Sequence, residues 1–115
     1  MAKKYKNLKE FYPFYLTEHQ NYTSRVLHFI GTGLFLTTLV LAITMSKYNL
    51  LYLCPVMGYG FAWVGHFFFE KNRPATFTYP LMSLISDFIM FYHIATFQIG
   101  KKLQAARETV NQENV

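Results

Sequence analysis

The sequence predicts an all-α integral membrane protein, built from a helical hairpin, a third apolar segment and an amphipathic N-terminal lead. Of its 115 residues 52% are hydrophobic and 19% aromatic, against 15% charged. The apolar residues fall into long blocks that charged residues avoid, as membrane spans do. We therefore expect one membrane domain over residues 1–115, with apolar segments at about 26–46, 48–69 and 80–99 and a polar tail at 101–115.

The first expected element is a short amphipathic lead helix ahead of the first span. Four aromatic residues, Phe11, Tyr12, Phe14 and Tyr15, precede the polar stretch 17–25. Aromatic rings with a polar edge prefer the level of the lipid head groups. These four side chains are therefore expected to anchor the lead helix at the membrane interface.

Two uncharged blocks predict the hairpin. Between Arg25 and Lys47 lie 21 residues without a formal charge, and between Lys47 and Glu70 lie 22. At a rise of ~1.5 Å per residue, each block reaches at least ~31 Å, about the thickness of one hydrocarbon core. Only residues 46–49 are left to form the turn, so the two spans are expected to lie side by side.

The third apolar block runs from Pro74 to Gly100 and carries one formal charge, Asp87. Its helix is expected to begin near Pro80, because proline suits the first position of a helix. The distribution of Lys and Arg around the first two spans places the N-terminus in the cytoplasm. Three crossings would leave seven basic residues inside and four outside, whereas a non-crossing segment gives ten and one. The charge rule disfavours three simple crossings and leaves open an interfacial, re-entrant or crossing segment.

The remaining charge pattern predicts the surroundings of the protein. The residues after Gly100 are expected to be a polar helix end that frays into disorder near Val115. The net charge of +5 fits anionic lipid head groups better than nucleic acid, because the basic residues cluster where apolar blocks end. The expected location is the bacterial inner membrane, or the endoplasmic reticulum membrane in a eukaryote, with the functional site facing the cytoplasm.

Three histidines are expected to meet at that face. His28 lies three residues past Arg25, and His66 lies four residues before Glu70, so a hairpin places both imidazoles at one depth. His19 precedes the first span on the same side of the membrane. Imidazole nitrogen suits Fe, Zn, Cu or Ni. The alternative is that each histidine only forms hydrogen bonds with neighbouring helices or water.

Other charged residues near this face are candidates for supporting roles. Glu70 follows His66 by four residues, so on an α-helix its carboxylate would share the face of that imidazole. Asp87 is the one acid within an apolar block, which favours a functional role and structural pairing about equally. Arg25 and Arg73 suit an anionic head group or simply mark topology. A fourth histidine, His93, would lie deeper and is expected to pack or form a hydrogen bond.

Three stretches in order carry a family resemblance. They are Glu18-His19, RVLHFIGT at residues 25–32 and GHFFFEKNRP at residues 65–74, continued by Pro80 and SLISDF at residues 83–88. In this combination, over about residues 11–95, the chain resembles the 2-hydroxy fatty acid dioxygenase family. That family consists of small multispanning membrane proteins with a role in fatty acid alpha-oxidation and lipid metabolism.

The resemblance implies a site and a reaction. Ferrous iron, Fe(II), would be held by His19, His28 and His66, and His93 matches none of the motifs. A long-chain 2-hydroxy fatty acid and O2 would react to give CO2 and a fatty acid one carbon shorter. Glu70 and Asp87 would support catalysis. The substrate carboxylate would be neutralised by Arg25 or Arg73.

Two other function classes stay open at this stage. His28 and His66 at equal depth are also suited to the axial ligation of haem in an electron-transfer protein. Asp87 would suit a small proton-coupled transporter, in which a homo-oligomer supplies the helices that a short chain lacks. A structural scaffold is the least specific alternative, and it predicts no metal.

Overall fold

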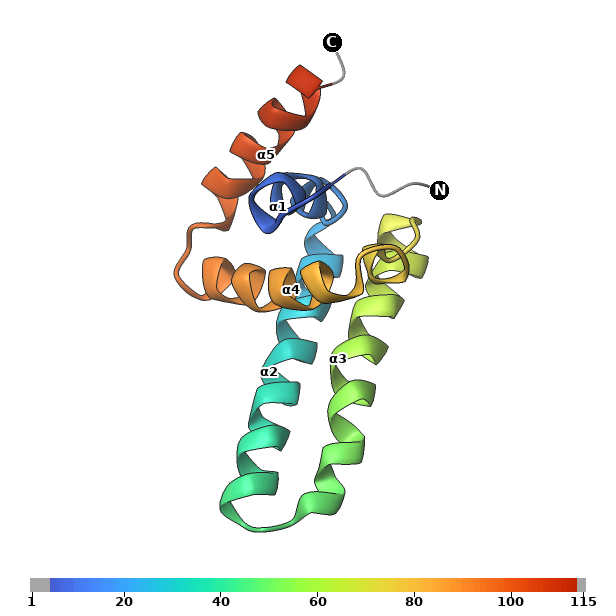
Figure 1. Ribbon diagram of the computed structural model, residues 1–115, viewed down its shortest axis with the longest axis vertical. Helices are drawn as coiled ribbons and strands as arrows, with labels where there is room; N and C mark the ends of the chain where they lie inside the picture. Colours follow the sequence, from blue (N-terminus) through green and yellow to red (C-terminus); the bar gives the residue numbers. More distant parts are fainter. Residues whose placement is uncertain (1–4, 114–115) are drawn as a thin grey trace.

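The computed structural model of the chain describes residues 5–113, and the regular elements in that range are all helical. Figure 1 shows two long rods side by side, joined by a tight turn. One rod is α2 (Tyr22–Thr44). The other is a continuous run of η1 (Tyr48–Tyr52), α3 (Leu53–Val64) and η2 (Gly65–Glu70). The predicted hairpin is confirmed.

Both rods are long and apolar enough to cross a membrane. Each spans 23 residues, with mean hydropathies of 2.1 and 1.2 in their most apolar windows. Only 22% of each window is buried inside the protein. A core helix of a water-soluble protein would be mostly buried, whereas here Val40 and Val56 remain 57% and 62% exposed.

The lead helix exists, but its aromatic residues lie in the protein core. α1 (Leu8–Thr17) is capped by Asn7, whose side chain accepts a hydrogen bond from the Glu10 backbone N–H at 2.9 Å. Phe11 is 0% exposed and Tyr15 2% exposed. The expectation that these two rings anchor the helix at the membrane interface is therefore wrong, because α4 and α5 cover them.

The third apolar segment forms a helix that runs across the hairpin. α4 (Pro80–Ala95) begins at Pro80, as predicted, and follows the short 3-10 turn η3 (Ala75–Phe77). Figure 1 shows α4 lying crosswise to α2 and α3. Its 16 residues reach about 24 Å, less than a hydrocarbon core of ~30 Å. The chain turns at Phe97, which has a φ of 61°, so this helix ends before residue 99.

The expected polar tail is an ordered helix within the described residues. α5 (Ile99–Glu113) packs against α1, with Leu103 5% exposed and Ala106 2% exposed. The spacing of three residues places both side chains on one face of the helix. Fraying near Val115 lies outside the described residues.

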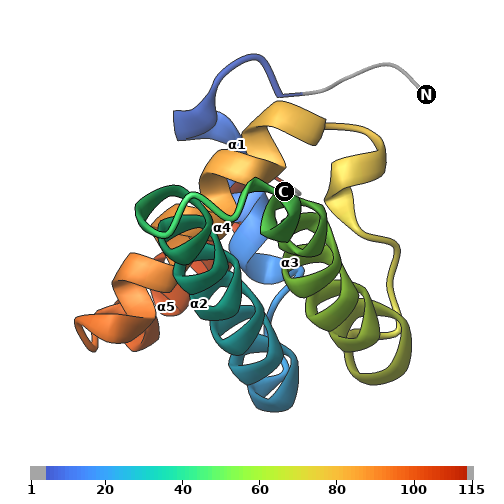
Figure 2. The same ribbon diagram turned by 90° about the horizontal axis from the view of Figure 1, so that it is seen from below.

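The three shorter helices gather at one end of the hairpin. Figures 1 and 2 show α1, α4 and α5 around the end where α2 begins, with the 45–47 turn at the far end. Their aromatic and aliphatic residues form a core over this open end, which we call the mouth of the hairpin. The buried members of this core are Phe11, Tyr15, Leu16, Tyr79, Met90, Leu103 and Ala106.

Candidate metal centre

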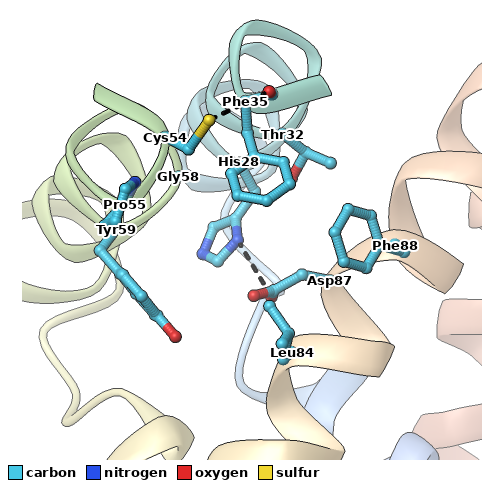
Figure 3. A pocket seen from close by; sticks show the side chains of 10 residues that line it. All are labelled: His28, Thr32, Phe35, Cys54, Pro55, Gly58, Tyr59, Leu84, Asp87 and Phe88. Carbon is cyan, nitrogen blue, oxygen red and sulfur yellow. Dashed lines mark hydrogen bonds and ion pairs between the residues drawn. The ribbon is translucent and has the colours of Figure 1, made fainter. Parts of the chain in front are cut away.

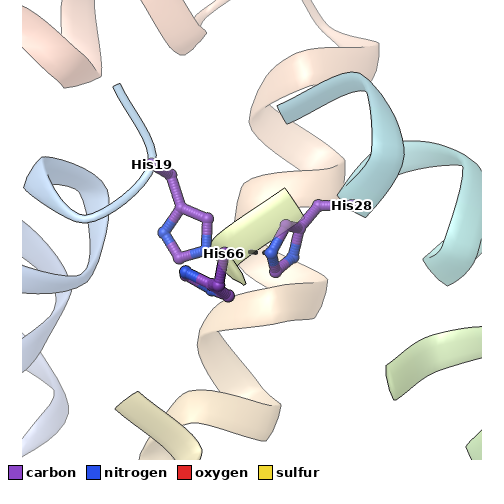
Figure 4. Close-up of side chains that lie close together, drawn as sticks. All are labelled: His19, His28 and His66. Atoms are coloured by element: carbon purple, nitrogen blue, oxygen red, sulfur yellow. Dashed lines mark hydrogen bonds between the residues drawn. The ribbon is translucent and has the colours of Figure 1, made fainter. Parts of the chain in front are cut away.

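Three histidine side chains meet beneath this core. His19, His28 and His66 are 0%, 4% and 3% exposed, and one potential ligand atom from each lies within 4.8 Å of the others. The ring centroid of His19 lies 4.3 Å from that of His28 and 4.5 Å from that of His66. Figure 4 shows the three rings turned toward one another. The convergence expected from the hairpin is present.

Local contacts hold the loop that carries His19. This residue lies between α1 and α2, and its backbone carbonyl accepts a hydrogen bond from Arg25 Nη1 at 2.8 Å. The backbone N–H of Asn21 donates to both carboxylate oxygens of Glu70, at 3.1 Å each. Asn21 also caps α2, since its side chain accepts a hydrogen bond from the Ser24 N–H at 3.1 Å. The loop is thus fixed to both rods of the hairpin.

Hydrogen bonds determine which nitrogen of two of the rings carries the proton. His19 Nδ1 lies 2.6 Å from the carbonyl oxygen of Tyr15, which can only accept, so Nδ1 is protonated. His66 Nδ1 lies 2.6 Å from Oδ1 of Asn72. The Asn72 amide is oriented because its Nδ2 donates to the carbonyl of Glu18 at 3.1 Å. In both histidines Nε2 is therefore left with a free lone pair.

The donor set fits a metal ion. His28 Nε2 lies 3.1 Å from His19 Nε2, while His28 Nδ1 lies 3.7 Å from Oδ1 of Asp87. In the tautomer that carries the Nδ1 proton toward the carboxylate, the two Nε2 lone pairs face each other and can bind one cation together. In the other tautomer, His28 Nε2–H donates a hydrogen bond to His19 Nε2 when no cation is bound. Two nitrogens at right angles around an ion, each bonded at ~2.1 Å, lie about 3 Å apart. The observed separation thus suits a shared metal.

The surroundings keep the ligands in their binding state. Burial, with the neighbouring histidines, lowers the pKa of His19 well below its usual range, so the ring is neutral at neutral pH. Burial raises the pKa of Asp87 to about 7, against the opposing effect of a hydrogen bond from the Tyr15 hydroxyl. Burial raises the pKa of Tyr15 as well, so that the hydroxyl remains a donor to the carboxylate.

Glu70 and Arg25 lie close to the site but hold its framework. Glu70 belongs to a π-helix, whose wider turn no longer places residues four apart on one face. Glu70 was expected beside the imidazole of His66, as a ligand or as the group that orients the ring. Asn72 makes the hydrogen bond to His66 instead, and Glu70 accepts a hydrogen bond from the N–H of Asn21. Arg25 is engaged with the carbonyl of His19. Both residues therefore position the loop that carries His19.

Two other candidates lie apart from the three histidines. Arg73 is exposed, with its guanidinium 5.1 Å from the centroid of the Phe77 ring. His93 Nδ1 forms a hydrogen bond with the Tyr12 hydroxyl at 2.7 Å, which confirms the hydrogen-bonding role expected for it. Asp87, by contrast, belongs to the site.

Two hollows adjoin the centre. The larger, of about 40 Å³, lies between α2 and α3 beneath α4 (Figure 3). The smaller, of about 20 Å³, extends toward η3. Three side chains, His28, Tyr59 and Asp87, line both hollows. Of the three histidines, His28 therefore borders both hollows and His66 borders the smaller one.

Reasoning from the sequence missed two functional side chains. Asn72 orients His66, and Tyr15 contributes both its carbonyl to His19 and its hydroxyl to Asp87. The signal for Asn72 was its place within the 65–74 motif, next to the histidine it orients. Tyr15 carried no such signal, because its contact with Asp87 joins residues 72 positions apart.

Comparison with known proteins assigns the chain to a family. Residues 5–99 match the family described as 2-hydroxy-palmitic acid dioxygenase Mpo1-like. No curated protein and no solved structure matches the chain. The matched segment covers most of the 115 residues and contains all three converging histidines. The chain therefore belongs to the 2-hydroxy-palmitic acid dioxygenase Mpo1-like family.

Proposed function

We propose that this protein is a metal-dependent dioxygenase that shortens 2-hydroxy fatty acids by one carbon. The observation that carries the proposal is the convergence of His19, His28 and His66, buried and with two Nε2 lone pairs free. The family match supplies the reaction class. Such a donor set, beside a hollow between two apolar rods, suits a lipid substrate whose head reaches a metal.

The proposed metal is Fe(II). An imidazole donor set accommodates it, and three protein ligands leave coordination positions open. When bound, ferrous iron would supply the one-electron chemistry that lets O2 react with a closed-shell substrate. The C1–C2 bond breaks, O2 takes up four electrons, and the products are CO2, water and the shortened fatty acid.

The side chains around the ligands have separate tasks in this proposal. The Tyr15 carbonyl and Asn72 hold two imidazoles with Nε2 inward. Asp87 lines both hollows, and with a pKa of about 7 its carboxylate can accept the proton of the substrate 2-hydroxyl at neutral pH. The core above the three histidines keeps bulk water from the reacting carbons.

The proposed setting is a membrane that the hairpin crosses once in each direction. The exposed apolar side chains of both rods support this setting. The basic residues near the mouth of the hairpin support a cytoplasmic location for that end. Arg73, exposed at the same end, would attract fatty acid carboxylates to the membrane surface, whereas Arg25 is held by the His19 carbonyl.

Metal analysis coupled to oxygen uptake tests the proposal. Protein purified without oxygen should contain one iron per chain, and 2-hydroxypalmitic acid should drive oxygen consumption. Palmitic acid serves as the inactive control ligand. Both readouts should be lost in His19→Ala, His28→Ala and His66→Ala but kept in His93→Ala, the matched histidine outside the cluster. A folded wild-type protein that binds no metal would overturn the proposal.

The geometry argues against the two alternative functions. A porphyrin held between His28 and His66 would need the space that His19 occupies, and neither adjoining hollow is large enough for a macrocycle. A Soret band in the purified protein would reverse this conclusion. Asp87 accepts a hydrogen bond from Tyr15 beside His28, which favours a role in the metal centre over one in proton-coupled transport.

A further inference from the structure

The two hollows at the metal centre differ in character. Two side chains that line the smaller hollow, Trp63 and Ser83, each have a buried polar atom, Nε1 and Oγ, with no hydrogen-bond partner among the described residues. Buried donors almost always have a partner, so such a pair indicates a bound polar group. A hollow of about 20 Å³ has room for roughly one water-sized group. One oxygen of a carboxylate matches that size and those donors.

The larger hollow has the opposite character. Its lining is largely apolar. Phe35 and Cys54 from the two rods and Leu84 and Phe88 from α4 are among the lining side chains (Figure 3). Its volume of about 40 Å³ accommodates about three water-sized groups, which corresponds to the first few methylenes of a chain. Beyond it the outer faces of both rods are exposed and apolar.

Both hollows open onto the same three side chains, His28, Tyr59 and Asp87. A molecule that extended through both would pass His28, one of the three converging histidines. We propose that the two hollows form one bipartite substrate site, in which Trp63 and Ser83 bind the carboxylate and the larger hollow holds the first carbons of the chain. This inference rests on the proposed function and adds the orientation of the substrate.

This orientation of the substrate would bring its C1–C2 bond close to His28. With a carboxylate oxygen between Trp63 and Ser83, the carboxyl carbon and its neighbour lie at the junction beside His28. The rest of the chain leaves between α2 and α3 toward lipid. Gly58 lines the apolar hollow, and there a side chain would occupy the path of the substrate. Gly58 is thus the position that determines whether a chain fits.

Two glycines on α3 provide a matched test of the apolar half. A Cβ added at Gly58 would meet Phe35 at 3.7 Å, an ordinary contact, and one added at Gly60 would meet nothing within 4 Å. Gly60 lines neither hollow. Gly58→Leu should weaken binding of 2-hydroxypalmitic acid about tenfold or more, since each excluded methylene accounts for about fourfold. Gly58→Ala should have a smaller effect, and Gly60→Leu should bind like wild type.

The single tryptophan allows binding to be measured without turnover. Trp63 is the only tryptophan of the chain and lines the smaller hollow, so its emission should change as 2-hydroxypalmitic acid is titrated without oxygen. Iron content of each variant shows that its metal centre is intact. Equal affinities for Gly58→Leu and Gly60→Leu at full iron content would overturn the assignment of the apolar half.

Two serines on α4 provide the matched test of the polar half. Ser83 and Ser86 are both buried, and neither hydroxyl has a hydrogen-bond partner within residues 5–113, but only Ser83 lines the smaller hollow. Ser83→Ala should weaken binding of 2-hydroxypalmitic acid about tenfold, the usual effect of losing a hydrogen bond to a charged group, and Ser86→Ala should not. Hexadecan-2-ol keeps the chain and the 2-hydroxyl but has a methyl group in place of the carboxylate. Its affinity should be the same in Ser83→Ala and wild type.

The outcomes separate this inference from the function on which it rests. Loss of affinity for hexadecan-2-ol and for the acid to the same extent in Ser83→Ala would show a structural effect and overturn the assignment of the polar half. A wild-type protein that binds 2-hydroxypalmitic acid with the predicted variant pattern but consumes no oxygen would overturn the dioxygenase proposal alone. Oxygen uptake without the variant pattern would overturn the bipartite site alone.

Discussion

At the scale of single residues, the candidate metal centre depends on which nitrogen each histidine turns inward. The Tyr15 carbonyl and the Asn72 amide each hold a ring by Nδ1, at 2.6 Å in both cases. The amide of Asn72 is itself held by the carbonyl of Glu18. This outer layer orients the imidazoles before a metal binds, which reduces the entropy lost on binding.

Asn72→Ala should weaken metal binding by about 10–100-fold, the usual effect of removing a group that orients a ligand. The reason is that His66 then loses the acceptor for its Nδ1–H and can rotate or change tautomer. The measurement is a metal titration against a competing chelator. Asn111→Ala, at an exposed position on α5, is the control. An unchanged affinity in Asn72→Ala would show that His66 is oriented by other contacts.

Asp87 should make the free energy of unfolding of the metal-free protein depend on pH. Its pKa rises from 3.8 to about 7 on folding, so the folded protein binds this proton more tightly than the unfolded chain does. Lowering the pH from 7 toward 4 should therefore stabilise wild type relative to Asp87→Asn, by up to about 1.4 kcal/mol per pH unit. Above pH 7 the difference in unfolding free energy between the two proteins should be constant.

Thermal unfolding of both metal-free proteins in detergent, across this pH range, measures the difference. Asparagine retains an oxygen that can accept the hydrogen bond from the Tyr15 hydroxyl, so the comparison isolates the titrating charge. Parallel stability curves for wild type and Asp87→Asn would contradict the raised pKa.

At the scale of the elements, the hairpin is held by close approach of its two rods. A Cβ at Gly31 would lie 2.9 Å from the carbonyl oxygen of Met57 and 2.9 Å from Cβ of Phe61, both too close. Two residues further along α2, a Cβ at Gly33 would meet Phe91 at an ordinary 3.6 Å. Small residues at such contacts let helix backbones pack directly against one another.

Gly31→Ala should destabilise the protein by about 1–3 kcal/mol, because the rods must separate to admit the methyl group. Gly33→Ala should be neutral or slightly stabilising, since alanine favours helix more than glycine does. Unfolding in detergent compares the two variants. Iron content should also fall in Gly31→Ala, since His28 and His66 lie on opposite rods. Equal stabilities would show that the rods are not in direct contact at Gly31.

At the scale of the whole molecule, both described ends of the chain lie at the mouth of the hairpin. Figure 1 shows α1 and α5 at that end and the 45–47 turn at the other. In a membrane that the hairpin crosses, α1, α4 and α5 must share one side and the turn must face the opposite side. In the proposed topology the chain crosses the membrane twice, and the three histidines lie on the same side as α1, α4 and α5.

Labelling with a membrane-impermeant maleimide tests this topology. In a Cys54→Ala background, which removes the single native thiol, Lys47→Cys should react in intact cells. Gln104→Cys, exposed on α5, should react only after the cells are permeabilised. Labelling of both positions from outside would contradict the two-crossing arrangement. The cysteine-free protein reports background labelling.

The sequence by itself determined the elements whose cause is local. The two spans follow from the absence of charge between Arg25, Lys47 and Glu70, because length and polarity alone decide whether a helix suits a bilayer. The shared depth of His28 and His66 then follows from counting residues along two antiparallel helices. The approach of His19 could be expected because this residue precedes the first span on the same side of the membrane.

Only the tertiary structure decided what depends on contacts distant along the chain. The crosswise direction of α4 and the burial of Phe11 follow from packing among α1, α4 and α5, which no local pattern encodes. Tertiary structure also decides that Asn72, and not Glu70, contacts the ring of His66. A π-helix widens the turn there, and Lys71, with a φ of 57°, reverses the chain so that Asn72 reaches the ring. Local propensity disfavours both the π-helix and the left-handed conformation of Lys71, so tertiary contacts must stabilise them.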